Sequence, residues 1–98
     1  MLPGSNVSAP VKYFPYWSTK AKDTVYRAMS DGFVCARTTG ISEVEGRTDG
    51  SNPPTTARNI NEGHVAADQC GITMPVKKGD YWKVINADLS VFWIPLRP

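Results

Sequence analysis

The sequence has no long apolar run, a single histidine, only two cysteines and almost balanced charge. No stretch approaches the roughly 20 consecutive apolar residues that a transmembrane helix needs, so we expect no membrane insertion. The opening "MLPGSNVSAP" has neither a basic segment nor an apolar core, so it is not a secretory signal. The sequence therefore predicts synthesis in the cytoplasm.

Charge of one sign is also missing, with eleven Lys and Arg residues against nine Asp and Glu residues and a formal net charge of +2. Nucleic-acid-binding domains usually gather their basic residues on one face. In this chain the basic residues are scattered along the sequence, so nucleic acid is not an expected partner.

The scarce reactive residues show no catalytic or metal-binding spacing. Cys35 and Cys70 lack the CxxC pattern of redox and zinc sites, and two buried thiols are favoured over one disulfide between them. His64 has no nucleophile-elbow pattern nearby, which favours a loop histidine over a catalytic or zinc-binding one. Glu43 and Glu45 point the same way in a strand, which favours a solvated edge or a weak cation site over paired catalytic carboxylates. The phosphate-binding glycine motifs are absent. We therefore expect no enzyme activity, no metal and no cofactor.

Proline and glycine, eight of each, interrupt the chain too often for long helices. Residues 1–23 are aromatic-rich and contain Pro10 and Pro15, which favours an extended arm or edge strand. Residues 24–38 read as two strands joined by a hairpin turn at 30–32. The polar stretch 38–64 predicts one short strand near 41–44 and otherwise long, solvent-facing loops.

The last third alternates strands and turns. "CGITMPV", "YWKVIN" and "LSVFWIPL" are expected strands, and "KKGD" between the first two is an expected hairpin turn. We favour this turn, built by Gly79 and Asp80 with Lys77 and Lys78 as soluble flanks, over an anion-binding site. The final strand is apolar on both faces, as where sheets stack or subunits meet. The sequence predicts an all-β fold of about seven or eight short strands, a small jelly-roll or β-sandwich over residues 24–98 with an extended arm over 1–23.

"ITMPVKKGDYWKV", followed by "LSVFWIPL", resembles the closing strands of small trimeric jelly-roll domains at the tips of phage tail fibres and tailspikes, which are tumour-necrosis-factor-like in fold. "AMSDGFVCART" is similar to the early strand pair of the same family. The resemblance covers residues 24–38 and 69–96, and it rests on turns and apolar positions. Residues 1–23 lie outside it, and such an arm is suited to clasping a neighbouring subunit.

The resemblance implies a non-enzymatic structural protein of a bacteriophage virion, made in the host cytoplasm. Its expected role is host attachment at a fibre or spike tip, or capsid decoration as a head-fibre component. The expected partners are two further copies of the chain in a homotrimer, other virion proteins and a host-surface glycan or receptor. The candidate subunit-interface residues are Trp82, Phe92, Trp93, Ile94, Phe14 and Trp17. The candidate receptor-facing residues, in a loop from 40 to 63, are Glu43, Glu45, Arg47, Asp49, Asn52 and Arg58.

Two other functions fit the same sequence. The first is a monomeric carbohydrate-binding module in which Tyr16, Trp17 or Trp82 stacks on a sugar ring, because aromatic faces give large contact areas. The second is a small hydrolase built around His64.

Overall fold

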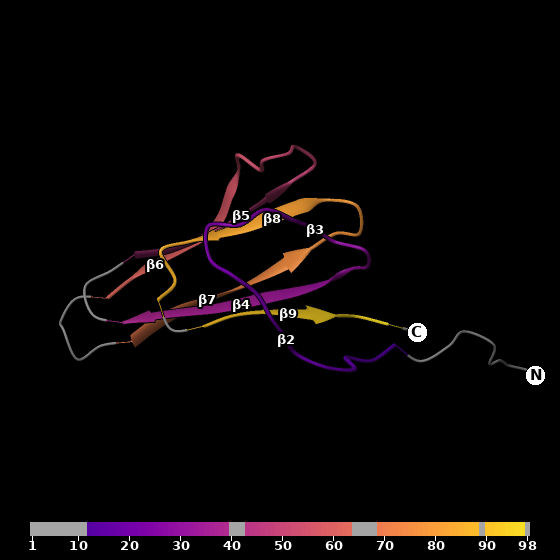
Figure 1. Cartoon of the computed structure of the whole chain (residues 1–98), viewed down its shortest axis with the longest axis horizontal. Coiled ribbons are helices and arrows are strands. Elements are labelled where there is room, and N and C mark those ends of the chain that lie inside the picture. The colour runs from indigo at the N-terminus through magenta and orange to yellow at the C-terminus, as the bar shows by residue number, and fades with distance from the viewer. Residues whose placement is uncertain (1–11, 40–42, 64–68, 89, 98) are drawn as a thin grey trace, which may run out of the picture.

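The structure, a computed structural model, describes residues 12–39, 43–63, 69–88 and 90–97. These residues form strands and no helix (Figure 1). The strands are β2 (Ser18–Thr19), β3 (Tyr26–Arg27), β4 (Gly32–Thr39), β5 (Glu43–Asp49), β6 (Ala57–Glu62), β7 (Gln69–Val76), β8 (Tyr81–Ile85) and β9 (Ser90–Pro95).

The strands make two four-stranded sheets, with the orders β2–β9–β4–β7 and β3–β8–β5–β6. Every pairing is antiparallel, and the pairs are nested along the chain: β2 with β9, β3 with β8, β4 with β7 and β5 with β6. This is the strand order of a jelly-roll, in which one long antiparallel hairpin is wrapped into two packed sheets. The prediction of an all-β jelly-roll or sandwich is confirmed.

The core lies between the two sheets and is supplied by alternate residues of the longer strands. Val34 and Met74 from one sheet meet Val44 and Val84 from the other, and none of the four side chains is exposed to solvent. Trp82 fills the space beside them, stacked between Tyr26 and Trp93 with ring centroids 4.7 Å and 5.8 Å away. The two-residue period of the strands thus places one apolar set inside, as the alternation in the sequence indicates.

Residues 12–20 lie along β9 of the same chain. Tyr13 and Arg97 exchange backbone hydrogen bonds of 2.8 and 2.9 Å, β2 pairs with β9, and the amide of Lys20 donates to the carbonyl of Val91. In Figure 1 this indigo segment follows the yellow strand β9. The described part of the predicted arm is therefore an edge strand that pairs within its own chain, while residues 1–11 lie outside the described residues.

The sequence predicts hairpins at residues 30–32 and 77–80, and both predictions are wrong, because the strands on either side of each turn do not pair with each other. β3 and β4 lie in different sheets, and so do β7 and β8, so residues 28–31 and 77–80 are corners that cross from one sheet to the other. A local sequence pattern marks the turn, but it does not say whether the next strand pairs with the previous one. Gly79 does adopt the expected positive φ, of 90°. The carboxylate that bonds this turn belongs to Asp31, which accepts the amide hydrogen of Lys78 at 2.8 Å.

The stretch 38–64 holds more strand than predicted. It contains two strands, β5 and β6, which pair as a hairpin, so the expectation of one short strand near 41–44 is wrong. Residues 40–42 and 64 lie outside the described residues. The polar composition misled the prediction because the outward positions of β5 and most of β6 meet solvent. Only Val44, Gly46 and Thr48 of β5 point into the core.

Two asparagines join the sheets at the edge where β6 approaches β7. The side-chain amide of Asn59 donates to the carbonyl of Thr73, and that of Asn61 to the carbonyl of Gly71, each at 3.0 Å. These carbonyls lie on β7, which pairs with β4 alone and so presents a free edge. The asparagine side chains therefore occupy acceptors that an open edge offers to other strands.

Candidate functional site

The outward face of the β2–β9–β4–β7 sheet is apolar. Phe33 lies opposite Ile94 and Cys35 opposite Phe92 where β4 pairs with β9, and Thr73 of β7 lies opposite Cys35 on the other side. Directly opposed residues in an antiparallel pair point to the same face of a sheet. β4 and β9 thus turn aromatic, aliphatic and thiol side chains away from the core, and β7 adds the hydroxyl of Thr73 beside them.

The aromatic arm lies over this face. The ring of Phe14 meets that of Phe33 edge-on with centroids 5.7 Å apart, and Trp17 meets Phe92 in the same way at 5.6 Å. Both arm residues remain widely accessible, with 49% of Phe14 and 62% of Trp17 exposed. The arm thus covers part of the apolar face but adds new exposed aromatic surface of its own.

A groove runs across this face between the arm and β7. It consists of two adjoining hollows of about 430 and 320 Å³, and Trp17, Cys35 and Thr73 line both. We call it the outer groove; its remaining walls are Phe14, Phe33, Ala36, Arg37, Gly71, Ile72, Ser90, Phe92 and Ile94. An exposed apolar groove with a few polar groups at its border is typical of a protein–protein or ligand contact.

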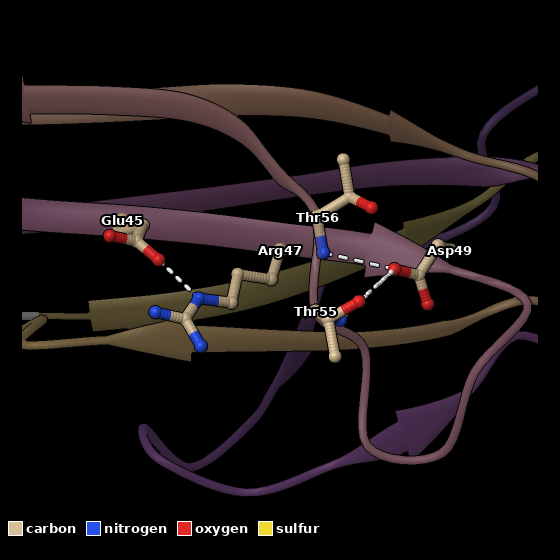
Figure 2. Close-up of polar contacts among 5 residues, drawn as sticks. All are labelled: Glu45, Arg47, Asp49, Thr55 and Thr56. Atoms are coloured by element: carbon tan, nitrogen blue, oxygen red, sulfur yellow. Dashed lines mark hydrogen bonds and ion pairs between the residues drawn. The ribbon is translucent and has the colours of Figure 1, made fainter.

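The outward face of the other sheet is charged instead. Glu43, Glu45, Arg47 and Asp49 follow one another along the outside of β5, and Lys83 of β8 lies opposite Arg47. Arg47 and Glu45 form an ion pair on this surface (Figure 2). The outward positions of β5 are therefore all charged, whereas those of β4 and β9 are mostly apolar, although Ile60 and Ile85 lie on either side of Glu45 on the charged face.

Asp49 organises the loop between β5 and β6. Its carboxylate accepts the amide hydrogens of Ser51 at 2.8 Å and of Thr55 and Thr56 at 2.9 Å. Figure 2 shows the bond from the Thr56 amide and a further one, of 3.2 Å, from the Thr55 hydroxyl. The Ser51 amide, followed by the Thr55 amide, holds the pKa of this carboxyl well below its usual range, because each bond favours the ionised form. The role of Asp49 in the structure is therefore to order a loop.

The six predicted interface residues divide between the core and the outer groove. Trp82 is only 1% exposed, so its ring has no surface for a second subunit or a sugar, and both of those predictions for Trp82 are wrong. Trp93 points inward and stacks on Trp82. Phe14, Trp17 and Phe92 line the outer groove together with Ile94, although Ile94 is just 7% exposed. The alternation of side chains along the last strand defines two apolar faces, but it does not show which face points into the core between the sheets.

The predicted receptor-facing residues lie on strands as well as in a loop. Glu43, Glu45, Arg47 and Asp49 are on β5, Arg58 is on β6, and Asn52 alone belongs to the connection between them. The picture of a single displayed loop from 40 to 63 is therefore wrong. The structure groups the four β5 residues on one charged face and leaves Asn52 exposed beside it.

Cys35 and Cys70 are both thiols and form no disulfide with each other. Cys35 points to the outer groove, whereas Cys70 packs against the core. They lie on opposite faces of the same sheet, which accounts for the absence of a bond between them. Each is partly exposed, so the expectation that both thiols are fully buried is not met.

The remaining sequence-based expectations concern His64, metal binding and membrane insertion. His64 lies outside the described residues. Within the described ranges, no three His, Cys, Asp or Glu residues are grouped so that they could hold a metal ion. Over the same ranges, no helix is long and apolar enough to cross a membrane.

Sequence reasoning missed part of the outer groove. In the sequence, Phe33 and Cys35 are two residues apart in an expected strand, and Thr73 lies between Ile72 and Met74, with nothing that marks these three as a surface site. A useful signal was present in β9, where both alternating sets of side chains are apolar and one set must therefore face outward.

Comparisons with protein-family models, with curated proteins and with solved structures find no match to this chain.

Proposed function

We propose that this chain is a non-enzymatic virion structural protein that forms a homotrimer through its outer groove. The observation that carries the proposal is the contrast between the two outer faces. One face gathers Phe14, Trp17, Phe33 and Phe92 around a groove, and the other is a row of charges. Burial of the apolar face against further copies removes from water a surface that a small core leaves uncovered.

The groove has the composition of a subunit contact. Aromatic side chains are enriched at the centres of protein interfaces and charged side chains are depleted there. Trp17 lines both hollows of the groove, Phe14 and Phe92 line one hollow each, and Arg37 and Ser90 belong only to the hollow that Phe92 lines. The trimeric state and the virion setting come from the resemblance to phage fibre and spike tips, and the composition of the groove supports its choice as the contact surface.

The same arrangement orients the molecule in a particle. Packing of the outer groove against other copies leaves the charged face of β5 and the loop ordered by Asp49 turned outward. This face, with Glu43, Glu45 and Arg47, is then available to a host receptor at a fibre tip or to solvent on a decorated capsid. Other virion proteins are the second class of partner.

The test is the mass of the particle in solution, measured by size-exclusion chromatography with light scattering at micromolar concentration. Wild-type protein is expected at three times the chain mass of 10.8 kDa. Trp17→Glu places a charge in the groove at a residue that contributes little to the core, and it is expected to give a monomer. Ile60→Glu is the matched control, because Ile60 is 52% exposed on the opposite, charged sheet.

A monomeric wild type contradicts the proposal, and so does a trimer that survives Trp17→Glu. A monomeric wild type that binds a glycan, together with a Trp17→Ala variant that no longer binds it, supports the alternative function, a carbohydrate-binding module. The observation that favours this alternative is the exposed Trp17 ring, which Phe92 supports from one edge.

A further inference from the structure

Four cations from three separate parts of the chain meet at one end of the sandwich. Lys12, Lys78 and Arg97 line a hollow of about 450 Å³, and Lys77 and Lys78 line an adjoining hollow of about 570 Å³. We call these two hollows the basic end. The sequence scatters these residues, which is why the Lys77–Lys78 pair looked too small to form a site when taken alone.

Backbone pairing brings the three segments together. Tyr13 and Arg97 exchange two backbone hydrogen bonds, which place Lys12 beside the end of the chain's last strand. The amide of Leu96 donates to the carbonyl of Asp31, and the carboxylate of Asp31 accepts the amide hydrogen of Lys78. The cations are therefore carried on a fixed frame even though the lysine side chains are exposed.

The charge of the basic end is largely uncompensated. Among the residues that line the two hollows, Asp31 is the only acidic one, and one of its oxygens is already bonded to the Lys78 amide. Arg97 is held by Tyr16, whose hydroxyl oxygen lies 3.1 Å from a guanidinium nitrogen and whose ring centre lies 5.8 Å from the guanidinium carbon. A guanidinium held in this way loses less side-chain entropy when it binds an anion.

Apolar side chains form the floor beside these cations. Phe33, Pro75 and Leu96 line the second hollow together with Lys77 and Lys78, whereas Val76, which also borders it, is 3% exposed and belongs to the core. Both hollows are open and shallow rather than enclosed, which suits one stretch of a polymer better than a small ion. Sugar rings offer apolar faces for such a floor, and phosphate, sulfate or carboxylate groups on the rings match the surrounding cations.

We propose that the basic end binds an acidic polysaccharide. The four cations contact its charged substituents, and the apolar floor contacts its sugar rings. This site adjoins the outer groove, with which it shares Phe33, but its cations lie outside that groove and binding of the polysaccharide does not require self-association. A monomeric protein can therefore bind, and a trimeric one can fail to bind, so this proposal and the proposed function can be tested separately.

The test measures binding of the full chain to immobilised dextran sulfate, with neutral dextran and polyphosphate as further probes. We expect binding to dextran sulfate that weakens as salt rises, since counterions are released from the polymer, and no binding to neutral dextran. The double variant Lys77→Glu/Lys78→Glu is expected to lower the affinity by at least roughly tenfold at low salt, because two phosphate- or sulfate-type contacts become repulsive.

The matched control is Lys20→Glu/Lys22→Glu. These lysines line a hollow beside Ala87 and Asp88, after the end of β8, whereas Lys77 and Lys78 precede its start. The control changes the net charge by the same amount at the opposite end of the strand and is expected to keep the wild-type affinity. Thermal unfolding followed by circular dichroism verifies that both variants are folded.

Each other outcome overturns the proposal. Equal losses in the two double variants mean that net charge alone drives binding. Binding to polyphosphate as tight as to dextran sulfate means that the sugar rings contribute nothing, and tighter binding to a single-stranded DNA oligonucleotide means that the wrong class of polyanion was chosen. Lack of binding to dextran sulfate at low salt rejects the site.

Discussion

Trp82 and Trp93 stack across the interior of the sandwich, with ring centroids 5.8 Å apart and planes 18° apart. Trp82 belongs to β8 and Trp93 to β9, so the pair joins the two sheets. Tyr26 extends the stack on the far side of Trp82. Two of the three tryptophans are thus used inside a single chain, and Trp17 is the one that remains for contacts outside it.

The stack gives a prediction for stability. Trp82→Ala removes the central ring from a closely packed core, and we expect it to lower the free energy of unfolding by about 3–5 kcal/mol. Trp17→Ala removes an exposed ring and is expected to cost less than about 1 kcal/mol under conditions where the protein is monomeric. Urea unfolding followed by circular dichroism measures both, and equal costs for the two variants contradict the assignment of Trp82 to the core.

Gly32 tests how closely β4 and β9 approach. A Cβ at this position would lie 2.5 Å from the carbonyl oxygen of Ile94 and 2.7 Å from the ring of Trp93. Since that oxygen is part of the backbone, Gly32→Ala is expected to destabilise the fold by about 1–3 kcal/mol. Gly50→Ala is the control, because its Cβ would meet only Asp80 Oδ1, at 3.9 Å, and we expect unchanged or slightly higher stability in thermal melts. Equal effects of the two substitutions contradict the close approach.

Asp49 gives a prediction for pH dependence. The amides of Ser51, Thr55 and Thr56 depress the pKa of this carboxyl in the folded state. Its stabilising contribution is therefore complete above the unfolded-state pKa of about 3.9 and is lost as pH falls toward the lower folded-state pKa. We expect Asp49→Asn to be less stable than wild type at pH 7 and the difference to shrink steadily between about pH 5 and pH 2.

Denaturant unfolding at a series of pH values measures this difference. Ser51→Ala keeps the backbone amide that donates to Asp49, so its pH profile is expected to follow that of the wild type. A constant gap between Asp49→Asn and wild type across the acid range contradicts the role given to the ionised carboxylate.

The asparagine contacts between β6 and β7 predict a local effect. Asn59→Ala combined with Asn61→Ala removes two side-chain bonds to the carbonyls of Thr73 and Gly71. We expect faster amide hydrogen exchange in β6 and a loss of about 0.5–1.5 kcal/mol per bond, toward the lower end because the contacts are exposed. Glu62→Ala on the same strand is the control, and equal exchange rates in β6 for all three proteins contradict the prediction.

Much of the fold follows from local sequence patterns. Strand alternation applied to 33–38, 72–76 and 81–85 divides each stretch into the two faces that the structure shows, and Gly79 correctly marked a turn with a positive φ. The same patterns failed at the corners, because β7 and β8 are joined by a four-residue turn and still belong to different sheets. Strand pairing depends on contacts between distant residues, which a turn does not encode.

The candidate sites show the same division. Phe14 and Trp17 were predicted as contact residues from their aromatic character, and they line the outer groove. Trp82 was predicted as a contact residue for the same reason and is buried, since composition does not distinguish an interior aromatic ring from an exterior one. The pairing of residues 12–20 with β9, and the resulting approach of Lys12 to Lys78, left no mark in the local sequence.

By itself, the sequence determined an all-β chain of short strands, the two side-chain sets of most of the longer strands and the positions of several turns. These follow from the two-residue period of a strand and from the backbone preferences of glycine and proline. The tertiary structure decided which set lies inside, which strands are neighbours, and that Lys12, Lys77, Lys78 and Arg97 share one end. Those outcomes depend on wrapping one long hairpin into two sheets, because that step alone brings residues 12–20 beside β9.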